Sequence, residues 1–235
     1  MDNQQLATTL SDHLKLDRPP VALAFVAQPP ANLPEPAQAP SACTFWRRAE
    51  TDTFYAPAAA HYECPVGAMT MGFELPPERA SEAQQLVGTM AELGYFDPAE
   101  VPHLPSVTKP HAGIVYGPLA SFPLPPDAVV VQATPVQAML LAEATGDATL
   151  RETPSLAAMG RPACAVVARA VNEAAATLSL GCIGARTYVE LPDNRALLVL
   201  PADSLPRTAA RLPALARANE TLAAFHGQQK ARFPE

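Results

Sequence analysis

Four cysteines are the residues of this chain best suited to carry chemistry, and they form two matched pairs. They are Cys43 and Cys64 in the first half and Cys164 and Cys182 in the second. The members of the two pairs are 21 and 18 residues apart, and each second cysteine has a glycine two or three residues later, Gly67 or Gly184. This echo predicts a duplicated unit. If the two units pack about a pseudo-twofold axis, all four thiols meet at one centre.

The local contexts of the cysteines favour thiolates bound to a shared group. Cys43 and Cys164 fall in the first turns of predicted helices, where unpaired N–H groups and the helix dipole stabilise negative charge. Structural zinc sites draw their ligands from close pairs of residues, and this chain has no such pair. Widely spaced cysteines suit an iron–sulfur cluster, whose ligands come from separate elements. We therefore expect a four-iron, four-sulfur cluster held by all four cysteines, with a redox or electron-transfer role; a zinc-stabilised ligand-binding module is one alternative.

A second alternative is a thiol enzyme or redox switch without metal. His61 lies three residues before Cys64, and a histidine beside a cysteine is the minimum arrangement for a reactive thiol. Arg47 and Arg186 follow Cys43 and Cys182, where they would hold an anionic ligand or offset the charge of a cluster. The candidates around the thiols are His61, Arg47, Arg186, Gly67 and Gly184. The partners expected from this set are a redox protein or a small anionic ligand.

Composition limits the class of protein. The 235 residues are 49% hydrophobic and include 27 prolines, which disfavours both a disordered chain and a purely helical bundle. A formal charge of −7 gives no reason to bind nucleic acid or anionic lipid. No apolar run has the length of a membrane span, and the first ten residues lack the features of a targeting peptide. We expect a cytoplasmic protein with one compact domain over residues 1–235.

The helices and strands that position the cysteines are predicted from the spacing of apolar residues and from the prolines and glycines at the ends of these segments. Helices are predicted over residues 3–16, from Pro77 to Gly94, from Pro135 to Gly146 and after Pro162, and strands over 21–26, 53–56, 71–75, 112–116 and 128–133. Residues 186–191 and 196–200 are predicted to form a hairpin around a Pro-Asp-Asn-Arg turn. The predicted fold is α/β or α+β, with mixed sheets, flanking helices and two similar halves at about 18–100 and 125–225.

Several words around the cysteines resemble the prokaryotic family catalogued as domain of unknown function 169. They are Trp46-Arg47-Arg48-Ala49 after Cys43, Cys64-Pro65-Val66-Gly67-Ala68, and Gly181-Cys182-Ile183-Gly184-Ala185-Arg186. The resemblance covers about residues 5 to 225, and its most specific parts are the Cys-Pro-x-Gly-Ala and Gly-Cys-x-Gly-x-Arg words. It implies that the four cysteines are functional positions of the family and makes a cluster-binding protein plausible, without specifying an activity.

Overall fold

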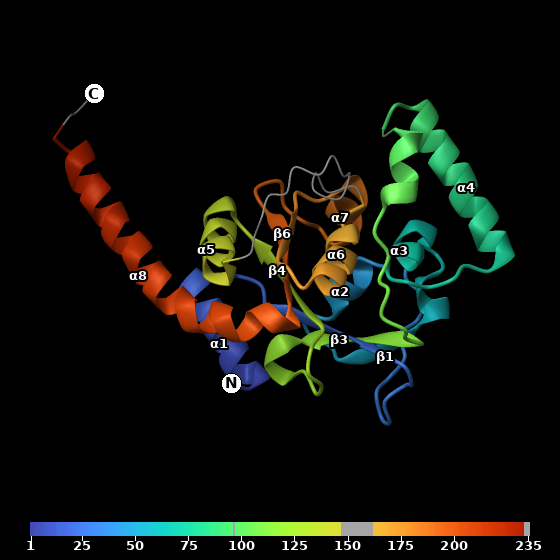
Figure 1. Cartoon of the computed structure of the whole chain (residues 1–235), viewed down its shortest axis with the longest axis horizontal. Helices are drawn as coiled ribbons and strands as arrows, with labels where there is room; N and C mark the ends of the chain where they lie inside the picture. Colours follow the sequence, from blue (N-terminus) through green and yellow to red (C-terminus); the bar gives the residue numbers. More distant parts are fainter. Residues whose placement is uncertain (96, 147–161, 233–235) are drawn as a thin grey trace.

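A six-stranded sheet, antiparallel in every pairing, runs through the centre of the molecule in the computed structural model (Figure 1). The structure describes residues 1–95, 97–146 and 162–232. The strands are β1 (Val21–Val26), β2 (Phe54–Pro57), β3 (Gly113–Pro118), β4 (Ala128–Ala133), β5 (Thr177–Ser179) and β6 (Ala196–Pro201), in the order β2-β3-β1-β4-β6-β5. The predicted combination of strands with flanking helices is confirmed, and the sheet is antiparallel where the sequence predicts mixed sheets.

Helices cover both faces of this sheet. On one face lie α2 (Thr44–Arg48), α3 (Pro65–Thr70), α6 (Ala165–Glu173) and α7 (Ile183–Tyr188). The other face is covered by α1 (Asn3–Leu14), α5 (Pro135–Thr145) and α8 (Leu205–Lys230). Helix α4 (Pro77–Glu92) lies at the side of the molecule with only Ala83 buried (Figure 1), and the short 3₁₀ turns are η1 (Ala58–His61), η2 (Pro98–His103), η3 (Leu119–Ser121) and η4 (Ala202–Ser204).

Burial on both faces explains the unbroken apolar runs of the central strands. Along β1, Val21, Leu23 and Phe25 face the core beneath α2, α3, α6 and α7, whereas Ala22 and Ala24 face α1, α5 and α8. Successive side chains of a strand point to opposite faces, so a strand covered on both sides needs apolar residues throughout. Among the described residues, none of the helices joins the length of a bilayer span to the necessary apolar character.

The two halves of the sheet have the same strand register. Strand β1 pairs with β3 over six residues, with Val21 opposite Pro118, and β4 pairs with β6 over six residues, with Ala128 opposite Pro201. Strands β2 and β5 extend the two halves at equivalent positions of β3 and β6. The pairing of β1 with β4 joins the halves. Within the described residues, the predicted strand after each second cysteine is absent from both halves, and an internal duplication stays a prediction. Strand β3 lies beyond residue 100, so the first half of the sheet reaches Pro118.

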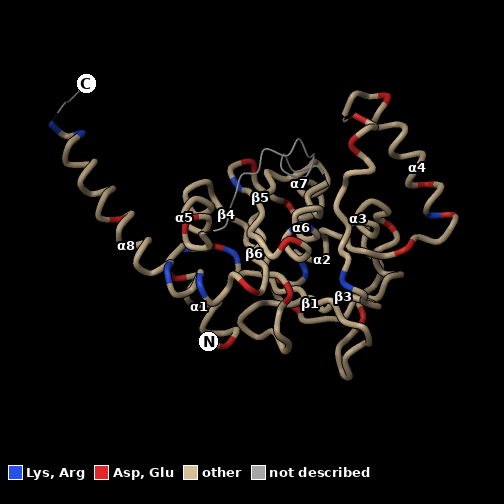
Figure 2. The backbone as a smooth tube through the Cα atoms, viewed as in Figure 1, with Lys and Arg blue, Asp and Glu red and all other residues tan. Residues whose placement is uncertain are grey.

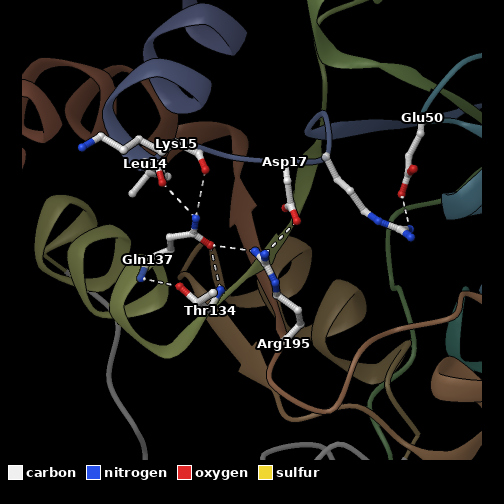
Figure 3. Close-up of polar contacts among 8 residues, drawn as sticks. Leu14, Lys15, Asp17, Glu50, Thr134, Gln137 and Arg195 are labelled. Carbon is white, nitrogen blue, oxygen red and sulfur yellow. Dashed lines mark hydrogen bonds and ion pairs between the residues drawn. The ribbon is translucent and has the colours of Figure 1, made fainter.

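A polar network fixes α5 and β6 against the end of α1 (Figure 3). The Gln137 side chain donates to the carbonyl oxygens of Leu14 (2.9 Å) and Lys15 (3.3 Å). The Arg195 guanidinium donates to the Gln137 side-chain oxygen (3.1 Å) and to Asp17 (2.7 Å). Charged residues of both signs are scattered over the described elements rather than gathered by sign (Figure 2). The network of Gln137 and Arg195 therefore ties α5 and the start of β6 to the end of α1.

Two predicted elements are wrong. Residues 71–75 form no strand, because Gly72 takes the left-handed conformation (φ +90°) directly after α3 and a side chain there would meet the Val107 carbonyl oxygen at 2.5 Å. Residues 186–191 do not pair with β6, because Arg186 lies in α7 and β6 pairs with β4 and β5 instead. The polar turn before β6 thus connects a helix to a strand, and Val189 and Leu191 are buried outside the sheet.

Candidate metal centre

Each of the four cysteines is the residue at which a helix begins. Cys43 precedes α2, Cys64 precedes α3, Cys164 precedes α6 and Cys182 precedes α7. All four helices lie on the same face of the sheet. The first backbone N–H groups of a helix have no partner within it, and its positive end favours an anion. The fold thus places all four thiols at the starts of helices on one side of the molecule.

Contacts within each half bring its two cysteine segments together. The Cys182 Sγ accepts hydrogen bonds from the N–H of Ala163, the residue before Cys164, and from the N–H of Ala185, both at 3.5 Å. In the first half, a Cβ on Gly67 would lie 2.8 Å from the Ala42 Cβ, beside Cys43, and 2.9 Å from the Cys64 Sγ. Each pair of cysteines is therefore closed by direct contact between the segments that carry its two members.

The two pairs also interact with each other. Burial raises the pKa of Cys43, and negative charge on Cys182 and Cys64 raises it further. Burial likewise raises the pKa of Cys164, with contributions from the other three thiols. The Thr70 hydroxyl, on α3 of the first half, donates to the Val66 carbonyl oxygen (2.8 Å) and partly offsets the rise in the pKa of Cys164. Four like charges at this range repel one another, so four thiolates require a positively charged centre.

The four thiols differ in exposure and do not form a ready-made site for one ion. Cys43 and Cys164 are buried, with exposed fractions of 5% and 3%, whereas Cys64 and Cys182 are partly exposed, and all four are free thiols. In residues 1–95, 97–146 and 162–232, no three Cys, His, Asp or Glu side chains are grouped so that they could hold a metal ion. The four cysteines are therefore close enough for their charges to interact, and Cys64 and Cys182 lie on the side of the group that is open to solvent.

Comparison with known proteins identifies the family. The model of domain of unknown function 169, described as uncharacterised ArCR, matches residues 9–211. The chain belongs to this family. No curated protein and no solved structure matches the chain.

The two sequence motifs typical of the domain 169 family have clear structural roles in this protein. In Cys-Pro-x-Gly-Ala, Cys64 caps α3, Pro65 takes its first position, and Gly67 allows the close approach of Ala42. In Gly-Cys-x-Gly-x-Arg, Cys182 caps α7, whereas a Cβ on Gly184 would make ordinary contacts, with the Cys182 Sγ at 3.7 Å. Of these two glycines, Gly67 is therefore the one where a side chain would clash, and the spacing of the two motifs alone does not distinguish it from Gly184.

His61 is buried among aromatic rings and does not reach Cys64 as a base. Its Nδ1 lies 3.0 Å from the Pro57 carbonyl oxygen and its Nε2 lies 3.0 Å from the Tyr116 hydroxyl. The ring also contacts Phe45 and Phe73. Burial lowers the pKa of His61 to about 4. With both nitrogens engaged, the neutral imidazole acts as a core residue in this domain 169 protein.

The two arginines near the cysteines lie in different surroundings. Arg47 forms an ion pair with Glu190 (3.2 Å) and is partly exposed. Arg186 donates to the carbonyl oxygens of Leu180 and Pro192, on either side of α7. Sequence reasoning missed Thr70. It favours Ser41 as the N-cap of the helix that carries Cys43; the structure starts α2 after Cys43, and the Ser41 hydroxyl accepts the Cys43 N–H at 3.2 Å. Ser41 stands two residues before Cys43, a local signal, whereas Thr70 meets Cys164 only through the packing of the two halves.

Proposed function

We propose that the protein binds one four-iron, four-sulfur cluster through Cys43, Cys64, Cys164 and Cys182 and serves in electron transfer or redox sensing. One observation supports this most strongly: four free cysteines begin four helices on one face of the sheet, and their thiols interact electrostatically across the two halves. Each cysteine of a cubane cluster binds a different iron, so the thiols surround a core and need not meet at one ion.

The donor set fits this group chemically. Thiolates are the usual ligands of iron–sulfur clusters. Iron supplies the positive charge that would offset the repulsion among Cys43, Cys64, Cys164 and Cys182. The N–H groups of Ala163 and Ala185 already donate to the Cys182 Sγ, and hydrogen bonds to ligand sulfur help to set the potential of such a cluster.

The exposure of the thiols favours electron exchange with another molecule. When bound, such a cluster takes up and gives up single electrons. Ligation by four cysteines leaves no iron open to a substrate, which favours electron transfer over substrate activation. Cys64 and Cys182 are partly exposed while Cys43 and Cys164 are buried. A redox partner protein would therefore approach over α3 and α7, in a reducing compartment such as the cytoplasm, where thiols stay available.

Loading the protein with iron tests this proposal. After anaerobic reconstitution with iron and sulfide, the wild-type chain should hold about four irons and about four sulfides. Each single Cys→Ala variant should lose most of this iron, whereas Thr187→Ala, an exposed position on α7, should load as the wild type does. Wild-type protein that takes up no iron, or that is isolated with one zinc per chain, would contradict the proposal.

A further inference from the structure

The two partly exposed cysteines, Cys64 and Cys182, lie in turns that are stabilised in different ways, and only the Cys182 turn involves Arg186. Its guanidinium donates to the Leu180 carbonyl oxygen (2.7 Å), which lies in the turn before Cys182. It also donates to the carbonyl oxygens of Pro192 (2.9 Å) and Leu191 (3.3 Å), which follow α7. One side chain thus joins the chain segments that enter and leave the helix begun by Cys182.

The residues on either side of Cys182 are exposed, while Gly181 lies against Leu191 and Cys182 packs against the core. Leu180 and Ile183, on either side of Cys182, have exposed fractions of 46% and 67%. Gly181 has a left-handed backbone (φ +87°), and its N–H donates to the Ser179 hydroxyl at 3.0 Å. A turn with exposed side chains depends on hydrogen bonds to its backbone for a fixed shape. Arg186 supplies a hydrogen bond to the backbone of this turn, and the Ala163 N–H supplies one to the Cys182 Sγ.

The equivalent turn of the first half uses packing instead. Pro65 and Gly67, which follow Cys64, are buried, and Gly67 lies against Ala42. Two residues after this glycine stands Met69, where the second half has Arg186 two residues after Gly184. Met69 is 49% exposed and has no group that donates a hydrogen bond. The turn after Cys64 therefore lacks an equivalent of the Arg186 side chain, which in the second half joins the segments on either side of α7.

We propose that Arg186 is a positioning residue that fixes the turn carrying Cys182 and so, together with the N–H groups of Ala163 and Ala185 that donate to its Sγ, holds Cys182 at the shared centre. The role of Cys182 as a ligand rests on the function proposed above; the clamp on its turn does not. The planar guanidinium fork donates in two directions at once, toward residues 180 and 191–192, and a lysine ammonium on a flexible stem is a poor substitute.

Site-resolved alkylation of the metal-free protein tests the clamp directly. Wild type, Arg186→Met, Arg186→Lys and Arg47→Met are treated with iodoacetamide in native buffer, and the rate at each cysteine is followed by mass spectrometry. Loss of the clamp opens the turn locally, so Cys182 should react about tenfold faster in Arg186→Met, with Cys64 within about twofold of wild type. Arg186→Lys should fall between the two. Arg47→Met removes a nearby positive charge that pairs with Glu190 and should match the wild type.

Two results would overturn the proposal: an unchanged Cys182 rate in both Arg186 variants, or a parallel rise at all four cysteines, which would show general loosening of the fold. Arg186→Lys keeps the charge and the aliphatic stem and gives the same answer if Arg186→Met is not recovered folded. A second readout uses protein reconstituted with iron, from which a chelator should remove iron faster in Arg186→Met than in Arg47→Met. If wild-type protein takes up no iron, the proposed function fails, and the alkylation rates still decide the role of Arg186.

Discussion

Replacing Gly67 with alanine tests whether close packing fixes Cys64. The new Cβ would lie 2.8 Å from the Ala42 Cβ and 2.9 Å from the Cys64 Sγ, both shorter than real Cβ contacts. Overpacking of this kind costs about 1–3 kcal/mol, against which the better helix propensity of alanine returns up to about 1 kcal/mol. We expect Gly67→Ala to lower the free energy of unfolding by about 1–2 kcal/mol and to move Cys64 relative to Cys43.

Gly184→Ala is the matched control, because it makes the same change at the other family glycine. Its Cβ would meet the Cys182 Sγ at 3.7 Å and Tyr188 at 3.9 Å, which are ordinary contacts. Within α7 it should stabilise the protein by up to about 1 kcal/mol. Urea unfolding of the metal-free proteins measures both effects, and alkylation of Cys64 reports its local position. Equal effects of the two substitutions, or a stabilising Gly67→Ala, would refute the packing argument.

Three further predictions concern the buried polar groups. The pKa of His61 is about 4 in the folded protein, below its ordinary 6.5, so the unfolded chain binds the proton first as pH falls. The free energy of unfolding should be level above pH 6.5 and drop by up to about 3 kcal/mol toward pH 4. His61→Phe should flatten this slope in urea titrations at each pH. Tyr116→Phe leaves the His61 Nε2 without its partner and should cost about 1–3 kcal/mol in urea unfolding; no loss would mean that the hydrogen bond is dispensable. Thr70→Val removes a hydroxyl that lowers the pKa of Cys164 and should raise the pKa of that thiol, seen as slower alkylation of Cys164 across a pH series. An unchanged profile would mean that Thr70 does not affect this thiol.

The sequence indicates the elements with strong local signals and misplaces those set by tertiary pairing. The strand at Val21–Val26 and the helix from Pro135 are confirmed, since an apolar run between prolines and an N-terminal proline with a terminal glycine are local features. The strand at residues 71–75 and the hairpin at 186–200 are wrong. Strand β5 has only three residues and joins the sheet through β6, and no window of sequence that short predicts a strand.

At the candidate site, local sequence predicts that cysteines stand at the starts of helices but does not predict which side chains surround them. The helix starts at Cys43 and Cys164 follow from the residues beside them, and the structure has helices there. The contact of Thr70 with Cys164 arises only when the two halves pack, so no local pattern contains it. The proximity of His61 to Cys64 in sequence suggests a thiol and base, whereas the aromatic core takes both ring nitrogens.

The most direct test of the central claim is the metal and acid-labile sulfide content of the wild-type chain purified strictly without oxygen, with its ultraviolet–visible spectrum. We expect a brown protein with broad charge-transfer absorbance and iron and sulfide in equal amounts, about four of each per chain. A colourless protein without iron after reconstitution, or one that holds zinc alone, would contradict a cluster at Cys43, Cys64, Cys164 and Cys182.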